Sequence, residues 1–265
     1  MTTETLTGPV GSHLTIRHVG VGAIGHWLAR GVADLRAAPV PALFWGLLFV
    51  VVGHLLTGWL ADRALTTVAL LGGFLLVGPI LAAAFYDISR RLEVGERAGL
   101  GVELRAWSGN IASIVAFSGL VLIMMAAWVM LSGILASLFL ETSRSLMVGE
   151  AATLGGLVGG ILDSPGGLGF AAVYLAAGAA VAALIFAIGV VSLPLMVHRH
   201  ADIATAIVTS LRTVRANPVP MALWAVTIVA ITLVGMAPYF LLLIVAMPLL
   251  GHATWHAYRD LVAEE

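Results

Sequence analysis

The sequence predicts an all-α polytopic membrane protein with six transmembrane helices, arranged as three parallel pseudo-repeats of an interfacial helix followed by a helical hairpin. Three observations support this fold class. The 265 residues are 60% hydrophobic and only 10% charged, whereas soluble domains carry about 25% charged residues. Long apolar runs recur along the chain, and one sequence motif occurs twice. So few polar groups could not cover a water-soluble fold of this size, so we expect the chain to be dissolved in lipid.

The apolar runs define six expected spans. A helix needs about 20 apolar residues to cross the hydrocarbon layer. Five runs meet this length, and Pro238 divides the last one, because proline breaks a helix interior. The expected spans are 40–60, 64–87, 109–140, 168–197, 218–235 and 237–256.

The repeated motif marks the start of two of these spans. Residues 35–45 and 214–224 match without a gap, and each copy opens an apolar run. A proline in the first turn of a helix gives up an N–H that has no partner there, and Asn217 can cap that turn. The matching pairs are Arg36/Arg215, Ala37/Ala216, Pro39/Pro218, Val40/Val219, Pro41/Pro220 and Trp45/Trp224.

Short segments precede the odd-numbered spans at 22–37, 201–215 and, more weakly, 98–108, each with apolar residues at helical spacing. Such segments are typical of helices that lie on a membrane surface. We therefore expect one membrane domain, 22–262, with repeats of about 22–92, 98–197 and 201–262, a cytoplasmic tail at 1–21 and a C-terminal tail at 263–265.

Three prolines fall in the inner part of the even-numbered spans: Pro79, Pro194 and Pro248. Each removes a backbone hydrogen bond and is expected to kink its helix. One interpretation is that kinked helices pack better here. The other is that three symmetric kinks frame a central cavity.

Arginine positions predict the orientation, since cytoplasmic loops retain positive charge. With the N-terminus inside, the inner segments hold eleven arginines and the outer loops hold only Arg63 and Arg144. We therefore expect both termini in the cytoplasm and the chain in a bacterial inner membrane. Arginines near the inner face are expected to contact lipid headgroups, namely Arg36, Arg90, Arg91, Arg215 and Arg259.

Composition excludes several classes of function. The chain has no cysteine, which removes disulfides, thiolate metal sites and a cysteine nucleophile. The net charge of −1 gives no basic face for nucleic acid. The N-terminus has neither a basic start nor an apolar core, so no cleaved signal peptide is expected.

His252 and His256 lie four residues apart, a spacing that lets two imidazoles share a metal ion. No glutamate follows His252, so the zinc-protease pattern fails. The alternative is that both lie where the helix meets the headgroups, in a polar belt with Trp255, Tyr258 and Arg259.

His54 and Asp87 are the candidate intramembrane polar residues. His54 lies inside the first expected span, and an ionisable residue at depth is a functional candidate by default. The alternative is an outer-interface histidine. Asp87 occupies the repeat position that matches His256 and can pair with Arg90 or Arg91, which favours a structural role.

Several stretches resemble a bacterial integral-membrane family of unknown function, number two-one-eight-nine of the domain-of-unknown-function series. They lie at 35–39, 72–79, 88–93, 190–195 and 248–261. Some relatives are labelled putative cytochrome c oxidase subunit. The resemblance implies an accessory or assembly component, because a haem–copper core needs about six intramembrane histidines and here one is deep and two are peripheral.

Three functions follow from these observations. The first is a non-catalytic accessory, assembly or lipid-organising component that contacts membrane lipids and a larger membrane (respiratory) complex. The second is a transporter or channel for a small or amphiphilic solute along the pseudo-threefold axis. The third is a metal-dependent membrane enzyme using His252 and His256; no other cofactor is expected, and the oligomeric state is left open.

Overall fold

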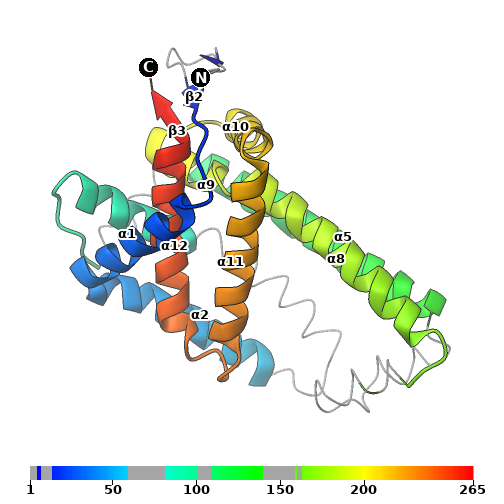
Figure 1. The fold of residues 1–265 in the computed structure, drawn as a ribbon. Helices are drawn as coiled ribbons and strands as arrows, with labels where there is room; N and C mark the ends of the chain where they lie inside the picture. Colours follow the sequence, from blue (N-terminus) through cyan, green and yellow to red (C-terminus); the bar gives the residue numbers. More distant parts are fainter. Residues whose placement is uncertain are drawn as a thin grey trace. The chain divides into compact units, whose positions relative to one another are not determined.

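The computed structural model describes residues 5–6, 14–58, 81–100, 109–139, 159 and 163–264. Its described part is mainly helical (Figure 1). The helices are α1 (Ala23–Ala37), α2 (Pro39–Gly58), a helical segment at 81–93, α5 (Ile111–Phe139), α8 (Gly167–Gly189), α9 (Ser192–Arg199), α10 (Ile203–Ala216), α11 (Pro218–Met236) and α12 (Leu243–Leu261). The strands are β1 (Thr5–Leu6), β2 (Leu14–Ile16) and β3 (Val262–Glu264).

Three described helices are long and apolar enough to cross a membrane: Ile111–Phe139, Gly167–Arg199 and Pro218–Met236. A fourth crossing is counted if α1 and α2, which meet at a bend of 107°, form one broken span. The chain is therefore a helical membrane protein, as the sequence predicts. Most of the expected span 64–87 and most of the expected interfacial segment 98–108 lie outside the described residues.

The repeated motif forms the same backbone turn in both copies. Ala38 ends α1 at φ −133° and ψ 61°, and Asn217 ends α10 at φ −128° and ψ 54°. The residue before a proline is driven out of the helical region by the proline ring, so the C-cap of each helix is the residue directly before Pro39 or Pro218. Each proline then begins the next helix at a position that needs no N–H.

Asn217 does not cap α11 as the sequence suggested. Its amide accepts a hydrogen bond from the Val19 N–H at 2.9 Å and donates to the Arg17 carbonyl at 3.0 Å and the Thr213 carbonyl at 3.2 Å. The side chain therefore holds the N-terminal segment against the turn. Ala38, at the matching position, has no side chain that could do this.

The two ends of the chain are paired. β2 lies antiparallel to β3, with Thr15 opposite Ala263, and the Arg17 N–H donates to the Leu261 carbonyl at 2.9 Å. β1 adds to the other edge of β2. Since paired strands occupy the same compartment, residues 14–16 and 262–264 lie on one side of any membrane that the chain crosses.

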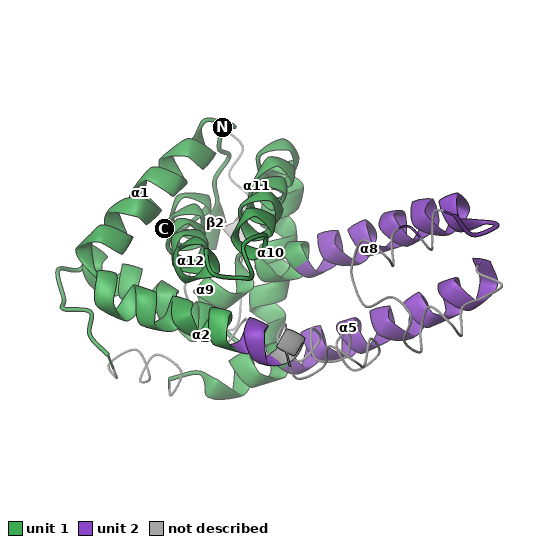
Figure 2. Cartoon of the chain, turned by 90° about the horizontal axis from the view of Figure 1, so that it is seen from below, with its two compact units in different colours: residues 1–51, 78–118, 186–265 green, residues 52–77, 119–185 purple. Residues whose placement is uncertain are grey.

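The chain divides into two compact units (Figure 2). Unit 1 comprises 1–51, 78–118 and 186–265, and unit 2 comprises 52–77 and 119–185. Within unit 2, Trp128 of α5 packs on Tyr174 of α8 with ring centroids 4.9 Å apart. A Cβ at Gly178 would lie 3.3 Å from the Trp128 ring, so this position suits a small residue.

α12 is the central helix of unit 1, and glycines let other elements approach it closely. A Cβ at Gly31 of α1 would lie 3.0 Å from the Leu249 carbonyl oxygen. A Cβ at Gly46 of α2 would overlap the Ile244 carbonyl oxygen. Pro248 has no N–H to donate to that carbonyl four residues earlier. α12 continues through Pro248 as one helix, with α2 packed against the carbonyl that the proline leaves unpaired.

Pro194 coincides with an actual break. α8 ends at Gly189 and α9 begins at Ser192. Pro194 has no N–H to donate to the carbonyl four residues earlier, which belongs to Val190 in the break. Ser210 of α10 bridges the break, because its hydroxyl donates to the Ala187 carbonyl at 2.7 Å and accepts from the Val191 N–H at 3.2 Å. The break is therefore stabilised by a side chain from the next helix. Pro79 lies outside the described residues.

Candidate functional site

The C-terminal half of α12 is enclosed by protein on every side. His252 is 0% exposed and His256 is 5% exposed, and Trp255 and Tyr258 are also buried. The interpretation that these four residues form a belt against lipid headgroups is therefore wrong. It fails because α1 and the segment 81–93 cover the faces of α12 that the sequence suggested would meet the membrane surface.

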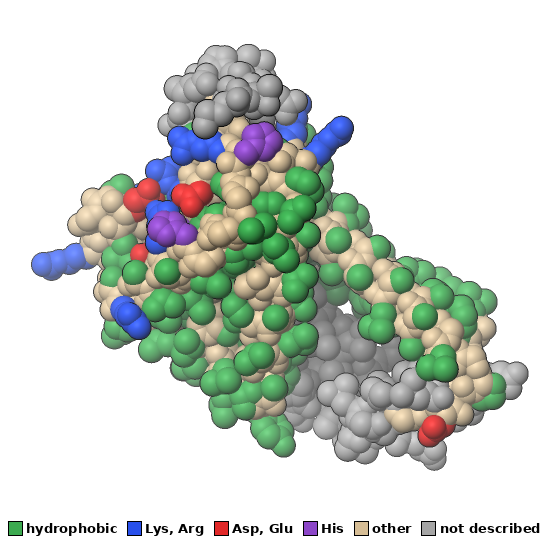
Figure 3. All heavy atoms as spheres, viewed as in Figure 1, with side chains coloured by type: hydrophobic (Ala, Val, Ile, Leu, Met, Phe, Trp, Pro, Cys, Tyr) green, Lys and Arg blue, Asp and Glu red, His purple; other side chains and the backbone are tan. Residues whose placement is uncertain are grey.

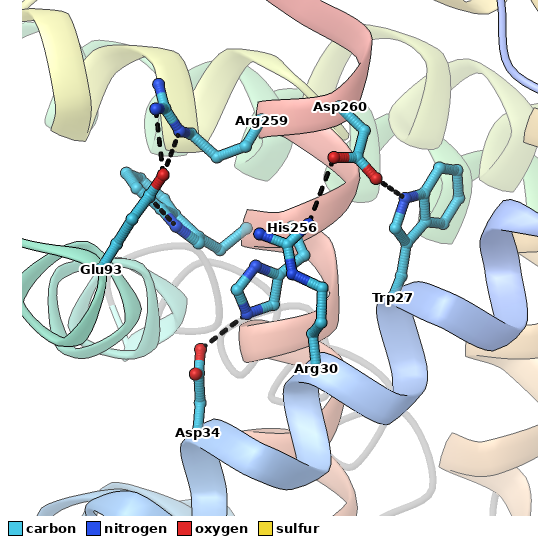
Figure 4. Close-up of polar contacts among 8 residues, drawn as sticks. Trp27, Arg30, Asp34, Glu93, His256, Arg259 and Asp260 are labelled. Carbon is cyan, nitrogen blue, oxygen red and sulfur yellow. Dashed lines mark hydrogen bonds and ion pairs between the residues drawn. The ribbon is translucent and has the colours of Figure 1, made fainter.

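The two histidines belong to one hydrogen-bonded chain. His256 Nε2 lies 2.8 Å from Asp34 Oδ2 on α1 (Figure 4). Ser89 Oγ, on the segment 81–93, donates to the same Asp34 oxygen at 2.6 Å and lies 2.8 Å from His252 Nδ1. The order is His256, Asp34, Ser89, His252, so two turns of α12 are joined through two other helices.

The single proton of the Ser89 hydroxyl fixes the hydrogen-bond directions. Ser89 donates to the Asp34 carboxylate, so its oxygen accepts from His252 Nδ1–H. His256 donates from Nε2–H to the same carboxylate. Each imidazole, when neutral, then keeps one lone pair, on His252 Nε2 and His256 Nδ1. Neither of these buried nitrogens has a hydrogen-bond partner in the described part of the chain.

Asp34 is the carboxylate that accepts hydrogen bonds from both Ser89 and His256. Its burial acts to raise the pKa of the carboxyl, but the hydrogen bonds from His256 and Ser89 and the nearby imidazoles outweigh this, so the pKa lies below its ordinary value. Hydrogen bonding to the charged form favours that form. The carboxylate is therefore ionised at neutral pH and holds both donors.

The geometry around the histidines bears on the metal hypothesis. Asp34 and Ser89 occupy one nitrogen of each imidazole. Across the described ranges, no three His, Asp or Glu side chains are grouped so that they could hold a metal ion. A metal ion would have to bind the two remaining nitrogens with ligands from elsewhere, and metal binding at His252 and His256 stays a prediction.

A second set of contacts ties α12 to its neighbours nearer the C-terminus (Figure 4). Asp260 accepts from Trp27 Nε1 at 2.9 Å and forms an ion pair with Arg30 at 3.2 Å, both on α1. Glu93 accepts from Trp255 Nε1 at 3.1 Å and pairs with Arg259 at 3.0 Å. Carboxylates on α12 and on the segment 81–93 thus bind donors on other helices.

Asp87 forms ion pairs within its own helical segment, whereas Tyr258 joins two helices. Asp87 is 1% exposed and binds Arg90 and Arg91, each at 2.7 Å, so the expected pairing is present. The Tyr258 hydroxyl lies 2.9 Å from His198 Nδ1 and accepts from Arg199 at 3.3 Å. These contacts join α9 to α12.

The remaining sequence candidates differ in their exposure. His54 is exposed on α2, and Pro194 and Pro248 are buried. Arg36 and Arg215 are exposed, whereas Arg90, Arg91 and Arg259 are partly covered and bind carboxylates.

Sequence reasoning missed Asp34, Ser89 and Glu93. Asp34 is separated from His256 by 222 residues and Ser89 from His252 by 163, so no local pattern connects them. The available signal was Gly31, three residues before Asp34, since a glycine inside a helical pattern lowers helix propensity and often has a packing reason.

These features define a helical membrane protein whose polar side chains are gathered inside a helix cluster around α12. Residues 67–198 match the model of a family described as "Predicted integral membrane protein (DUF2189)". The match confirms the predicted resemblance, and over this segment the chain belongs to that family. The matched segment includes Asp87, Ser89 and Glu93 but neither α1 nor α12. No curated protein and no solved structure matches the chain.

Proposed function

We propose that the protein is a non-catalytic component of the bacterial inner membrane, acting as an accessory, assembly or lipid-organising subunit beside a larger membrane complex. The pairing of charges around α12 carries this proposal. Glu93 binds Arg259 and Asp260 binds Arg30 across helices, and Asp87 is neutralised within its own helix. Charges compensated in this way hold helices together, whereas a catalytic site presents its groups to a substrate.

The exposed faces of the apolar helices support a role in packing. In both α5 and α11, only 22% of the most apolar window is buried within the protein. Ile123, Met130 and Leu138 of α5 are largely exposed, as are Val226 and Leu233 of α11. Such surfaces are stable only against lipid tails or the apolar helices of another subunit.

The topology that we propose has six spans in three parallel repeats, with both termini in the cytoplasm. The pairing of β2 with β3 requires an even number of crossings between them. The excess of arginine in alternate loops assigns that side to the cytoplasm.

Single-cysteine labelling tests this topology, because the chain has no native cysteine. Val94→Cys lies in a proposed inner loop and Leu241→Cys in the turn between α11 and α12, and both residues are exposed. A membrane-impermeant maleimide added to intact spheroplasts should label position 241 at once and position 94 only after permeabilisation. Equal labelling of both positions in intact spheroplasts would contradict the topology.

The accessory role is tested with membranes from cells that lack the chain. A complex that co-migrates with the chain on native gels should lose abundance in its absence and recover with the wild-type gene. The purified chain in liposomes should move no solute across the bilayer. Solute flux by the chain alone would favour a transporter instead.

A further inference from the structure

α10 is built with its polar face inward and its apolar face outward. Thr209, Ser210 and Thr213 are fully buried, while Val208 is 44% and Leu211 is 40% exposed. A helix on a water-facing surface has the opposite arrangement. The buried hydroxyls are satisfied: Thr209 and Thr213 donate to carbonyls four residues earlier at 2.7 and 2.8 Å, and Ser210 bridges the α8–α9 break.

The position of α10 in the chain places this apolar face beside the hydrocarbon layer. Only Asn217 separates α10 from α11, a helix that meets the length and composition of a membrane span. Figure 1 shows α10 turned away from the axis of α11 at one end of that helix. α11 continues the apolar surface with the exposed side chains of Val219 and Leu223.

Positive charge borders the exposed apolar face. Arg212 and Arg215 are exposed near the C-terminal end of α10, and neither has an ion pair with another side chain in the described ranges. The one carboxylate at α10 is Asp202, which caps the opposite end through Thr205 at 2.6 and 3.0 Å. Arginine binds phosphate oxygens with paired N–H donors. Figure 3 shows basic side chains gathered at the end of unit 1 where α10 lies, above the apolar surface of α11.

We propose that α10 lies in the membrane interface and that Arg212 and Arg215 bind the phosphate of an anionic phospholipid, with Val208 and Leu211 in contact with its acyl chains. This inference rests on the membrane location proposed above. A lipid satisfies the apolar face and the two arginines together. A soluble phosphate satisfies only the arginines, and a protein partner would have to supply both an apolar and an acidic surface.

Lipid retention tests the proposed site. The detergent-solubilised protein is titrated with phosphatidylglycerol or phosphatidylcholine, and bound lipid is counted by native mass spectrometry. Each basic residue near an anionic surface contributes about 1 kcal/mol, or about fivefold in affinity. We expect Arg212→Gln with Arg215→Gln to weaken phosphatidylglycerol binding by at least about fivefold and to leave phosphatidylcholine unchanged.

The matched control is Arg97→Gln, which removes one positive charge from an exposed position on another segment and is compared with Arg212→Gln alone. It should change phosphatidylglycerol binding less than twofold or so. Equal losses in Arg97→Gln and Arg212→Gln, or competition by inorganic phosphate as effective as by the lipid, would overturn a site on α10.

Spin labels separate failure of this inference from failure of the membrane location. Labels at Val208→Cys on α10 and Val226→Cys on α11, in bilayers, should both be more accessible to oxygen than to a water-soluble nickel chelate. Position 226 in lipid with position 208 in water would overturn the inference alone. Position 208 shielded from both reagents would indicate a protein partner and also overturn it. Both positions in water would contradict the membrane location itself.

Discussion

Asp34 on α1 accepts a hydrogen bond from His256 on α12 at 2.8 Å, across 222 residues of sequence. The same Asp34 oxygen accepts from Ser89 at 2.6 Å. One carboxylate oxygen therefore joins three helical segments. This arrangement, together with the Glu93 and Asp260 contacts, explains why the C-terminal half of α12 is buried although its sequence is rich in polar and aromatic residues.

Asp34→Ala is expected to destabilise the protein by about 3 kcal/mol, because it leaves a buried hydroxyl and a buried imidazole N–H without an acceptor. Asp34→Asn keeps an acceptor oxygen and should cost about 1 kcal/mol. Thermal unfolding in detergent at neutral pH measures both. Equal losses in the two variants would mean that the negative charge, and not the hydrogen bonds, stabilises the site.

Gly46→Ala is expected to cost at least about 2 kcal/mol, since overpacking forces a rigid neighbour to move. Here the added Cβ meets the Ile244 carbonyl in the backbone of α12. Gly25→Ala on α1 is the control, because its Cβ has no atom within 4 Å. That change should stabilise the protein by about 0.5 kcal/mol through helix propensity. Similar unfolding temperatures for the two variants would contradict the close approach of α2 to α12.

Ser210→Ala should destabilise the α8–α9 break by about 1–3 kcal/mol, because the Val191 N–H loses its partner in a buried position. Thr227→Ala is the comparison: its hydroxyl bonds to the Leu223 carbonyl of its own helix and is exposed. It should change stability by no more than about 0.5 kcal/mol. Hydrogen exchange at Val191 should increase only in the Ser210 variant.

Asn217→Ala makes the second copy of the repeated motif identical at this position to the first, which has Ala38. It removes the acceptor for the Val19 N–H and the donor to the Arg17 carbonyl. Hydrogen exchange of residues 14–19 should accelerate at least about tenfold, the effect of about 1.4 kcal/mol on local opening. Asn110→Ala, which removes bonds to the Met196 and Ala201 carbonyls, should leave that segment unchanged.

The sequence located the helices better than their surroundings. The expected span 218–235 corresponds to α11, and the expected interfacial helix 201–215 corresponds to α10, because apolar length and the Asn-Pro boundary are local signals. The burial of Thr209, Ser210 and Thr213 on α10 was not evident, since hydropathy records residue types and not which helix covers them. The burial of His252 and His256 depends on contacts with α1, whose Asp34 lies 222 residues away from His256 in the sequence. No pattern of neighbouring residues predicts such contacts.

The pairing of Asp87 with Arg90 and Arg91 was predictable because residues three and four apart share a helix face. The bonds of Asp34, Ser89 and Glu93 were not, because each joins segments that only the tertiary fold brings together. Pro248 lies inside a continuous helix, with Gly46 packed against the carbonyl of Ile244 four residues earlier. A proline in the sequence marks a missing hydrogen bond but not how the fold accommodates it.

A double-mutant cycle between Asp34→Ala and His256→Ala tests most directly the claim that a buried polar contact holds α1 against α12. Unfolding free energies of the wild type, the two single variants and the double variant are measured in one detergent. We expect a coupling energy of about 1.5 kcal/mol or more, with the double variant little less stable than the worse single variant. Losses that add within about 0.3 kcal/mol would contradict the contact and the account built on it.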